Sequence, residues 1–170
     1  MNLNGKRVTL RPLERSDFPS VVAVYQSNPA YNCLRNGSPG LSLEQWTAEY
    51  EETLSLMDGR WLAVCAGEVL IGVSHVRTHH PREGKGWISL ILLHADWQRK
   101  GLGREAVSLL EGWFQSEGCS QVHTGVITEN EPALRFWGAL GYEQYRQVPG
   151  QVGRLTQPVL LLAKMTADRR

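Results

Sequence analysis

The stretch between Trp87 and Gly118 constrains the fold most, because an apolar run, a short turn with two glycines and an amphipathic helix follow one another there. The run from Trp87 to Leu93 has almost no polar alternation and has the length of a strand. This pattern predicts a central strand that is buried on both faces. Apolar residues then recur at helical spacing from Leu102 until Gly118 ends the pattern. The chain is therefore expected to fold around a strand, a glycine turn and a helix.

The turn before this helix has the features of an anion-binding site. Gly101 and Gly103 allow a bulky ligand to approach the backbone, and the helix start directs unpaired N–H groups and a positive dipole end at one point. Four side chains add possible donors at that point: Gln98, Arg99, Lys100 and Arg104. The sequence thus predicts a phosphate site. The same spacing is equally consistent with an ordinary strand-to-helix turn among solvated basic residues.

The segment from Gly101 to Ala106 also matches the dinucleotide fingerprint G-x-G-x-x-A. That fingerprint requires its first glycine at the end of the strand and an acidic residue at the tip of the next strand. Here a polar segment separates the strand from Gly101, and no acidic residue ends the next predicted strand where one is needed. The dinucleotide interpretation is therefore disfavoured.

A second motif follows one helix and one strand later. Its residues are Asn130, Ala133, Phe136, Trp137 and the pair Gly141-Tyr142. Together with Gln98-x-x-Gly101-x-Gly103, this motif resembles the GNAT N-acetyltransferases, in which the glycine turn binds the pyrophosphate of acetyl-CoA. The segment from Val8 to Leu13, followed by Ser16-Asp17, is similar to the branch that acetylates ribosomal-protein N-termini and aminoglycosides. The resemblance spans nearly the whole chain and implies one N-acetyltransferase domain over residues 1–170.

The resemblance implies roles for individual residues, with acetyl-CoA as the co-substrate and no metal. Backbone N–H groups of Leu92 and Leu93 would bond the pantetheine arm and the thioester oxygen. Amides from Arg99 to Arg104 would hold the phosphates. Asn130 would bond the pantetheine arm or an ordered water, although its position also fits a helix N-cap. The implied cofactor-binding residues are Leu92, Leu93, Gln98, Arg99, Lys100, Gly101, Leu102, Gly103, Arg104, Asn130, Ala133 and Phe136.

Acetyl transfer to an amine also requires a base, because amines are protonated near neutral pH. Glu129 is the first candidate, acting directly or through water, since it ends the predicted strand beside Asn130. A carboxylate on the rim or at a helix start would look the same in sequence. Ser89 interrupts the apolar central strand and could orient a water there, or it could be a buried hydroxyl with a local partner.

At the residue that would protonate the CoA thiolate, this sequence differs from the family pattern. Many members place a tyrosine seven residues after the motif asparagine, whereas this chain has Trp137. An indole N–H donates a hydrogen bond but does not release a proton at ordinary pH. Tyr142, Tyr145 or water would then reprotonate the thiolate. The same departure keeps open a function of another class, a non-catalytic acyl-CoA-binding or interaction module.

The resemblance implies an α/β (α+β) fold, with a mixed, mostly antiparallel sheet splayed between its fourth and fifth strands and flanked by helices. Residues 28–40 are rich in helix breakers and predict a loop, which in this family lines the acceptor site. Ser42 and Gln45 predict a capping box for a helix with Trp46 and Tyr50, whose rings either join the core or face the acceptor.

The remaining pattern predicts further elements in chain order. The first half has a strand over 7–13, a helix capped by Ser16 or Asp17, a hairpin of strands 61–66 and 69–76, and an exposed connection over 79–86. The second half has a strand over 121–128, a helix from Pro132 to about Leu140, and closing strands over 142–148 and 159–163.

Composition excludes several classes of protein. A net charge of +1 argues against a nucleic-acid surface. The three cysteines share no CxxC spacing, and nothing completes a metal set with His75 and His79, so neither a disulfide framework nor a metal site is predicted. No apolar leader or membrane-length run is present, which predicts a cytoplasmic protein without membrane contact. The protein is expected to be a monomer or a homodimer. The amine acceptor, a small molecule or a protein N-terminus, is not identified by any motif.

Overall fold

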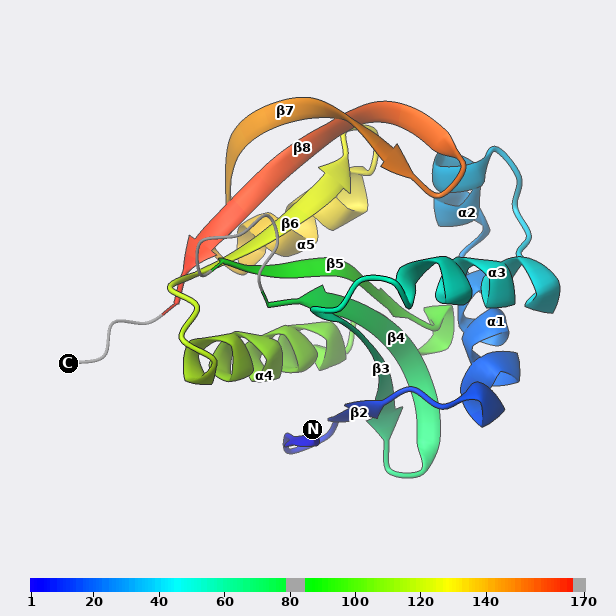
Figure 1. Ribbon diagram of the computed structural model, residues 1–170, viewed down its shortest axis with the longest axis horizontal. Helices are drawn as coiled ribbons and strands as arrows, with labels where there is room; N and C mark the ends of the chain where they lie inside the picture. The colour runs from blue at the N-terminus through cyan, green and yellow to red at the C-terminus, as the bar shows by residue number, and fades with distance from the viewer. Residues whose placement is uncertain (79–84, 167–170) are drawn as a thin grey trace.

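The computed structural model describes residues 1–78 and 85–166. Within these residues, eight strands form one sheet in the order β1-β2-β3-β4-β5-β6-β8-β7 (Figure 1). The strands are β1 (Leu3–Asn4), β2 (Thr9–Pro12), β3 (Gly59–Ala66), β4 (Val69–Arg77), β5 (Lys85–Leu93), β6 (Gln121–Ile127), β7 (Glu143–Val152) and β8 (Leu155–Met165). Neighbouring strands are antiparallel except β5 and β6, which run parallel. The predicted mixed, mostly antiparallel sheet is therefore confirmed.

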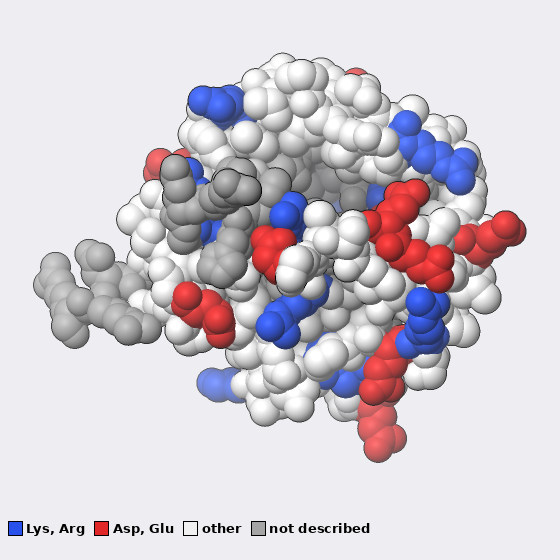
Figure 2. Space-filling model, viewed as in Figure 1, with Lys and Arg blue, Asp and Glu red and all other residues white. Residues whose placement is uncertain are grey.

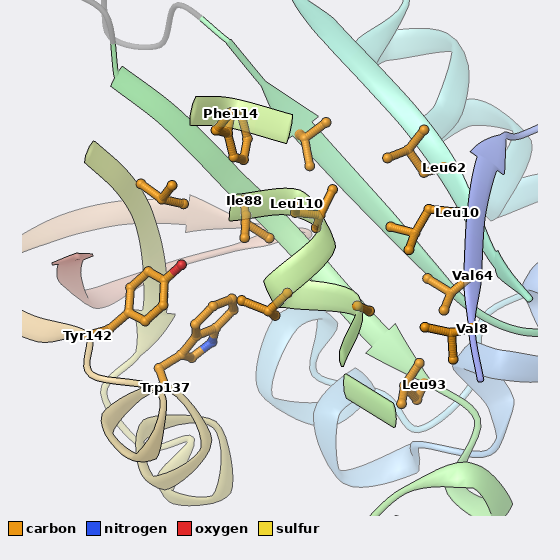
Figure 3. Packing of buried hydrophobic residues seen from close by; sticks show 14 of the residues in the cluster. Val8, Leu10, Leu62, Val64, Ile88, Leu93, Leu110, Phe114, Trp137 and Tyr142 are labelled. Carbon is orange, nitrogen blue, oxygen red and sulfur yellow. The ribbon is translucent and has the colours of Figure 1, made fainter. Parts of the chain in front are cut away.

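Helices cover both faces of this sheet. They are α1 (Phe18–Gln26), α2 (Pro29–Asn36), α3 (Leu43–Thr53), α4 (Leu102–Ser116) and α5 (Glu131–Ala139), with single 3₁₀ turns at Arg15–Asp17 and Ala95–Trp97. Helix α4 buries Leu110 and Phe114 against Ile88 of β5 in one cluster (Figure 3). On the opposite face, Val21 of α1 and Trp46 of α3 pack with Val73 of β4 in a second cluster.

The sheet divides between β5 and β6. These strands pair from Lys85 with Gln121 to Trp87 with His123, and no further pair follows. The Thr124 hydroxyl donates a hydrogen bond of 2.8 Å to the Ile88 carbonyl at the point where the strands part. Beyond this point β5 stays paired with β4, and β6 stays paired with β8. The predicted splaying between the fourth and fifth strands is therefore confirmed, because those strands are β5 and β6 once the additional strand β1 is counted.

The division of the sheet changes the burial of β5. Ile88 and Leu93 are buried, whereas Ser89 is exposed and the apolar residues between Ser89 and Leu93 are half-buried. The prediction of burial on both faces is wrong for this second half, because no strand covers its edge there. Strand β5 also begins at Lys85, so the last two residues of the predicted 79–86 connection are strand, and residues 79–84 lie outside the described part of the chain.

Helix α2 replaces most of the loop that was predicted over residues 28–40. Pro29 occupies its first turn, where a missing N–H costs no hydrogen bond, and Gly37 ends it with a left-handed φ of 76°. The buried Asn32 side chain donates at 2.8 Å to the carbonyls of Tyr25 and Pro39. The breaker residues mark the two ends of a short helix, so the loop prediction is wrong for its central part.

The closing hairpin is longer than predicted. Strands β7 and β8 continue through the segment that was expected to be a loop between 148 and 159, and only Gly153 and Arg154 separate them. Pro149 and Pro158 face each other in this ladder. Because β7 is an edge strand, Pro149 is tolerated there, and proline did not mark a strand end.

Smaller differences concern the N-terminal part. The predicted strand over 7–13 is shortened to β2, and Asp17 lies at the start of α1 but turns its side chain back to Glu14 N–H and to Arg11, both at 2.8 Å. The capping box of α3 is confirmed, because Ser42 accepts from the Gln45 amide and the Gln45 side chain accepts from the Ser42 amide. The predicted strands over 61–66, 69–76 and 121–128 and the helix after Pro132 are also confirmed to within a few residues.

Two glycines allow a test of the packing between α4 and β5. A Cβ atom at Gly86 would press against the Phe114 ring, whereas a Cβ at Gly112 within α4 would meet no atom within 4 Å. We expect Gly86→Ala to lower the free energy of unfolding by about 1–3 kcal/mol through overpacking. Gly112→Ala should be neutral or stabilise by up to about 1 kcal/mol through helix propensity. Urea denaturation of both variants checks this, and equal effects would contradict the packing described.

Candidate active site

A cleft of about 1800 Å³ opens where β5 and β6 separate. Leu90, Ile91 and Leu92 of β5 form part of one wall, and the starts of α4 and α5 contribute Gly103 and Ala133. Helix α2 and strand β7 line the other end. Figure 2 shows the surface hollowed beneath the β7–β8 hairpin. The site is therefore bounded by the edge of β5 on one side and by helix starts on the other.

The glycine turn presents backbone donors beside this cleft. Arg99 and Gly101 both adopt left-handed backbone conformations, with φ of 60° and 79°. Left-handed residues that alternate with other conformations direct successive N–H groups to one side, which forms a concave anion site. Amides of Leu102, Gly103 and Arg104 occupy the first turn of α4, and none donates to another described residue. The predicted arrangement of unpaired amides is present, and Arg99, Gly101, Gly103 and Arg104 also line the cleft.

Arg7 stabilises this turn through hydrogen bonds to its backbone carbonyls. Its guanidinium donates to the carbonyls of Lys100 at 2.8 Å and Gly101 at 3.2 Å. Glu105 of α4 in turn accepts from the amides of Arg7 and Val8 at 2.9 and 2.7 Å. Sequence reasoning missed Arg7, because its partners lie more than 90 residues away and no local pattern signals such a contact. The N-terminal segment therefore fixes the shape of the turn.

Gln98 does not point to the predicted phosphate position. Its side-chain amide donates at 2.8 Å to both Asn28 Oδ1 and the Leu93 carbonyl. Asn28 also donates to the Leu93 carbonyl, at 2.9 Å. These contacts join the turn to the end of β5 and the start of α2. The prediction that Gln98 supplies a phosphate donor is thus corrected to a positioning role.

The phase of β5 decides which amides face the cleft. The His94 amide bonds to the Ile71 carbonyl at 2.7 Å, and Leu92 lies opposite Val73 in the same register. Because antiparallel pairs alternate, Leu92 directs its N–H and C=O toward β4, whereas Ile91 and Leu93 direct theirs toward the cleft. The side chains of Asn28 and Gln98 both donate to the Leu93 carbonyl, which agrees with this carbonyl facing away from β4. Ile91, not Leu92, therefore joins Leu93 as a candidate main-chain donor.

The second motif lies on the opposite wall of the cleft. Asn130 Oδ1 accepts from the Ala133 amide at 3.3 Å, so the helix N-cap interpretation is confirmed. Asn130, Ala133 and Phe136 all line the cleft. A Cβ atom on Gly103 would lie 3.2 Å from the Phe136 ring, so α4 and α5 approach closely here and a larger residue would require the ring to shift.

Two candidate catalytic residues reach the cleft. Glu129 is exposed at the end of β6 and lines the cleft, and its carboxylate forms no ion pair or hydrogen bond with another described residue. Ser89 is also exposed and lines the cleft, so its interpretation as a buried hydroxyl is wrong. Both residues are therefore accessible to a bound ligand.

The tyrosines expected to reprotonate a thiolate lie elsewhere. The Tyr142 hydroxyl donates to Glu111 Oε1 at 2.9 Å, and burial raises the pKa of Tyr142 well above its ordinary value. Figure 3 shows Tyr142 and Trp137 pointing into the cluster of Ile88 and Leu110. The Tyr145 hydroxyl lies 2.8 Å from His123 Nδ1, and neither tyrosine lines the cleft. Both predicted donors are thus excluded by position.

Other predicted alternatives are resolved by burial. Trp46 is fully buried in the second cluster with Tyr50 packed against it, and neither lines the cleft, so the core interpretation is confirmed. His75 lines the cleft with a pKa lowered to about 4, first by burial and then by the charge of Arg77, so it is neutral at pH 7. Across residues 1–78 and 85–166, no three His, Cys, Asp or Glu side chains gather as a metal site would require. No helix in those ranges has the length and apolar character that crossing a membrane demands.

Comparison with known proteins identifies related sequences and folds. The sequence model of the acetyltransferase (GNAT) family matches residues 23–142. A search of curated protein sequences finds no match. An acetyltransferase from Thermus thermophilus superimposes with a TM-score of 0.75 at 21% identity, over 97% of this chain and 99% of that chain. An acetyltransferase from Salmonella typhimurium that modifies the N-terminal serine of ribosomal protein L7/L12 gives 0.81 at 12% identity, over 97% and 99%. A spermidine N-acetyltransferase from Vibrio cholerae, solved with CoA and spermine, gives 0.73 at 17% identity, over 95% and 97%.

The contacts of Glu105 predict a specific response to acid. Partial burial raises the pKa of Glu105, but the amide hydrogen bonds of Arg7 and Val8 and the Arg7 charge outweigh it, so the pKa lies below its ordinary value of 4.5. Ionised Glu105 therefore stabilises the fold above that value, and this contribution is lost as the pH falls through the lowered pKa. We expect Glu105→Gln to lower the melting temperature at pH 7 and to flatten the loss of stability between about pH 5 and pH 3. Exposed Glu68, changed to Gln, is the control and should leave both quantities unchanged.

Proposed function

Because the chain belongs to the acetyltransferase (GNAT) family, we propose that it moves an acetyl group from acetyl-CoA to a primary amine by direct transfer in a ternary complex. One observation carries the proposal: the unpaired amides at the start of α4 lie at the cleft where β5 loses its partner strand. A diphosphate and an extended pantetheine arm require these two features side by side. Free cysteines at positions 33, 65 and 119 are consistent with a cytoplasmic enzyme.

The described residues suit acetyl-CoA, which when bound supplies the activated acetyl thioester. The amides of Leu102, Gly103 and Arg104 would donate hydrogen bonds to the diphosphate oxygens, and the exposed basic side chains of Arg99 and Lys100 would add positive charge. The main-chain groups of Ile91 and the amide of Leu93 would bond the pantetheine arm as a missing strand would. The Asn130 side-chain amide, whose oxygen caps α5, keeps its N–H donors for the arm or a water.

Transfer then needs three events at the reacting carbonyl. The amine nitrogen attacks the thioester carbon, the C–N bond forms, and the C–S bond breaks. An N–H of β5 stabilises the oxyanion. Glu129 takes the amine proton, directly or through a water oriented by Ser89, and water protonates the departing thiolate. This assignment of water follows from the distant positions of Tyr142 and Tyr145.

A non-catalytic acyl-CoA-binding module is the second candidate, because Trp137 and Tyr142 are committed to the core. Release of CoA thiol from acetyl-CoA in the presence of amines distinguishes the two. Binding of CoA by calorimetry without thiol release from any amine would favour the module. Failure to bind CoA would overturn both candidates.

Two left-handed glycines at opposite ends of α4 test the diphosphate site. Gly101 has φ of 79° and its Cβ would lie 3.1 Å from Arg7 Nη2, whereas Gly118 has φ of 86° with no atom within 4 Å of its Cβ. Both alanine variants carry similar backbone strain. We expect Gly101→Ala to weaken CoA binding by about tenfold or more, since one misdirected charge-assisted hydrogen bond costs about 1.5–3 kcal/mol. Gly118→Ala should bind CoA normally, and equal affinities in calorimetry would refute the site.

Glu129 and Glu131 form a matched pair for the base. Both are exposed, but Glu129 lines the cleft and Glu131 faces Arg135 at 3.8 Å. We expect Glu129→Gln to reduce kcat by about 10²-fold while the Kd for CoA is unchanged. Glu131→Gln should retain kcat. A Glu129→Gln enzyme with normal turnover would exclude this residue as the base without affecting the proposed reaction.

A further inference from the structure

The tip of the β7–β8 hairpin is anchored to the end of α2. The Arg154 amide donates to the Arg35 carbonyl at 3.0 Å and to Asn36 Oδ1 at 3.1 Å. The Gln157 side chain donates to the Leu34 carbonyl at 2.7 Å. Gly153 at the tip has φ of 60°, and a Cβ there would lie 2.6 Å from the Arg35 carbonyl and closer still to Asn36 Oδ1. We term these contacts of Gly153, Arg154 and Gln157 with α2 the hairpin anchor.

The anchor places a roof over one end of the cleft. Figure 1 shows the hairpin arching from α5 to α2 above β5. Val148 and Val152 of β7 line the cleft from above, and Tyr31 and Leu34 of α2 close its end. The floor is formed by β3, β4 and β5. The hairpin therefore covers this end of the cleft, which we call the chamber.

The chamber is lined mainly by apolar and aromatic groups. These include Tyr31, Leu34, Trp61, Trp87, Leu90 and Val152. Its charged side chains face each other: Arg35 pairs with Glu49 at 2.6 Å, and Arg77 pairs with Asp58 at 2.9 Å. Arg35 is only 5% exposed, so its pair with Glu49 is part of the wall. Of the carboxylates described along the cleft, Glu129 alone lacks an ion pair, and the proposed function employs it as the base.

The mouth of the chamber has a different character. Besides Glu49 in the wall, helix α3 carries Glu44, Glu51 and Glu52 and no Lys or Arg, and Arg15 pairs with Glu51 at 3.4 Å. Figure 2 shows both acidic and basic side chains beside the hollow. Acidic side chains at the mouth attract protonated amines, but solvated charges add little to selectivity. Selection then depends on what the interior accepts.

We infer that the acceptor is a small primary monoamine with an apolar, preferably aromatic, body. A polyamine would carry further ammonium groups into the chamber, where no unpaired carboxylate besides the base is described to meet them, and burying an unpaired charge is unfavourable. A protein N-terminus would bring many backbone amides and carbonyls, for which a mainly apolar lining offers few partners. This inference rests on the proposed function and names the substrate class of the same site.

A panel of amines tests the inference through thiol release from acetyl-CoA. The probes are 2-phenylethylamine, spermidine, and an eight-residue peptide that begins with serine and has a free amino group. We expect kcat/KM for 2-phenylethylamine to exceed that for each of the others by about tenfold or more. Equal or better turnover of spermidine or of the peptide would overturn the inference while leaving the proposed function intact. No turnover of any amine, with CoA bound, would instead refute the proposed function.

Variants at two hairpin tips test the roof itself. Gly153 and Gly67 both have φ of 60° at two-residue turns, but a Cβ on Gly67 meets no atom within 4 Å. Gly153→Ala must displace the tip from α2, and Gly67→Ala adds only the backbone strain. We expect Gly153→Ala to raise KM for 2-phenylethylamine several-fold, to narrow its advantage over the peptide, and to leave the Kd for CoA unchanged. Gly67→Ala should have the same KM for 2-phenylethylamine, the same preference over the peptide and the same Kd for CoA as the unaltered protein.

A milder change covers the case in which Gly153→Ala does not fold. Asn36→Ala removes one acceptor of the Arg154 amide and leaves the Arg35 carbonyl in place. It should change the preference between 2-phenylethylamine and the peptide in the same direction by a smaller factor. Unchanged selectivity in a folded Gly153→Ala or Asn36→Ala protein, with the melting temperature measured in parallel, would show that the anchor does not define the acceptor.

Discussion

The separation of β5 from β6 is the constraint on which the rest of the structure depends. A strand inside a sheet satisfies its N–H and C=O groups through its neighbours, and each group left unpaired in the interior is costly. The protein satisfies part of this edge internally: Thr124 bonds the Ile88 carbonyl, and Asn28 and Gln98 bond the Leu93 carbonyl. The main-chain groups of Ile91 and the amide of Leu93 are left for a ligand. A gap in the sheet is thus converted into a candidate binding site.

Local patterns predicted the parts of the fold that local contacts determine. The central strand, the glycine turn, the Ser42 capping box and the helix after Asn130 each depend on residues within one turn or strand of each other, and each is present. Features that depend on distant partners were missed. Arg7 reaches the turn from the start of the chain, and the choice of Ile91 over Leu92 follows from register with β4. Apolar spacing in β5 carries no information about which edge a given amide faces.

Two misreadings share a physical cause. The sequence predicts loops at residues 28–40, which are rich in proline and glycine, and between 148 and 159, which contain glycine, but in both places regular structure continues. Pro29 needs no N–H at the first turn of α2, and Pro149 lies in an edge strand. The helix and the longer hairpin that result meet at the hairpin anchor. The sequence-based errors therefore fell on the two elements that together enclose the proposed acceptor end of the cleft, whereas the glycine turn at the other end was foreseen.

The hairpin anchor is made largely through main-chain atoms: the Arg154 amide and the carbonyls of Leu34 and Arg35 take part whatever side chains those positions carry. The inward-facing residues of β7 contribute nothing to it. Substitutions of the β7 side chains that line the chamber can therefore change its shape without detaching the hairpin tip from α2 or disturbing the distant glycine turn. The preference for the acceptor can thus diverge among homologues while the coenzyme site is kept.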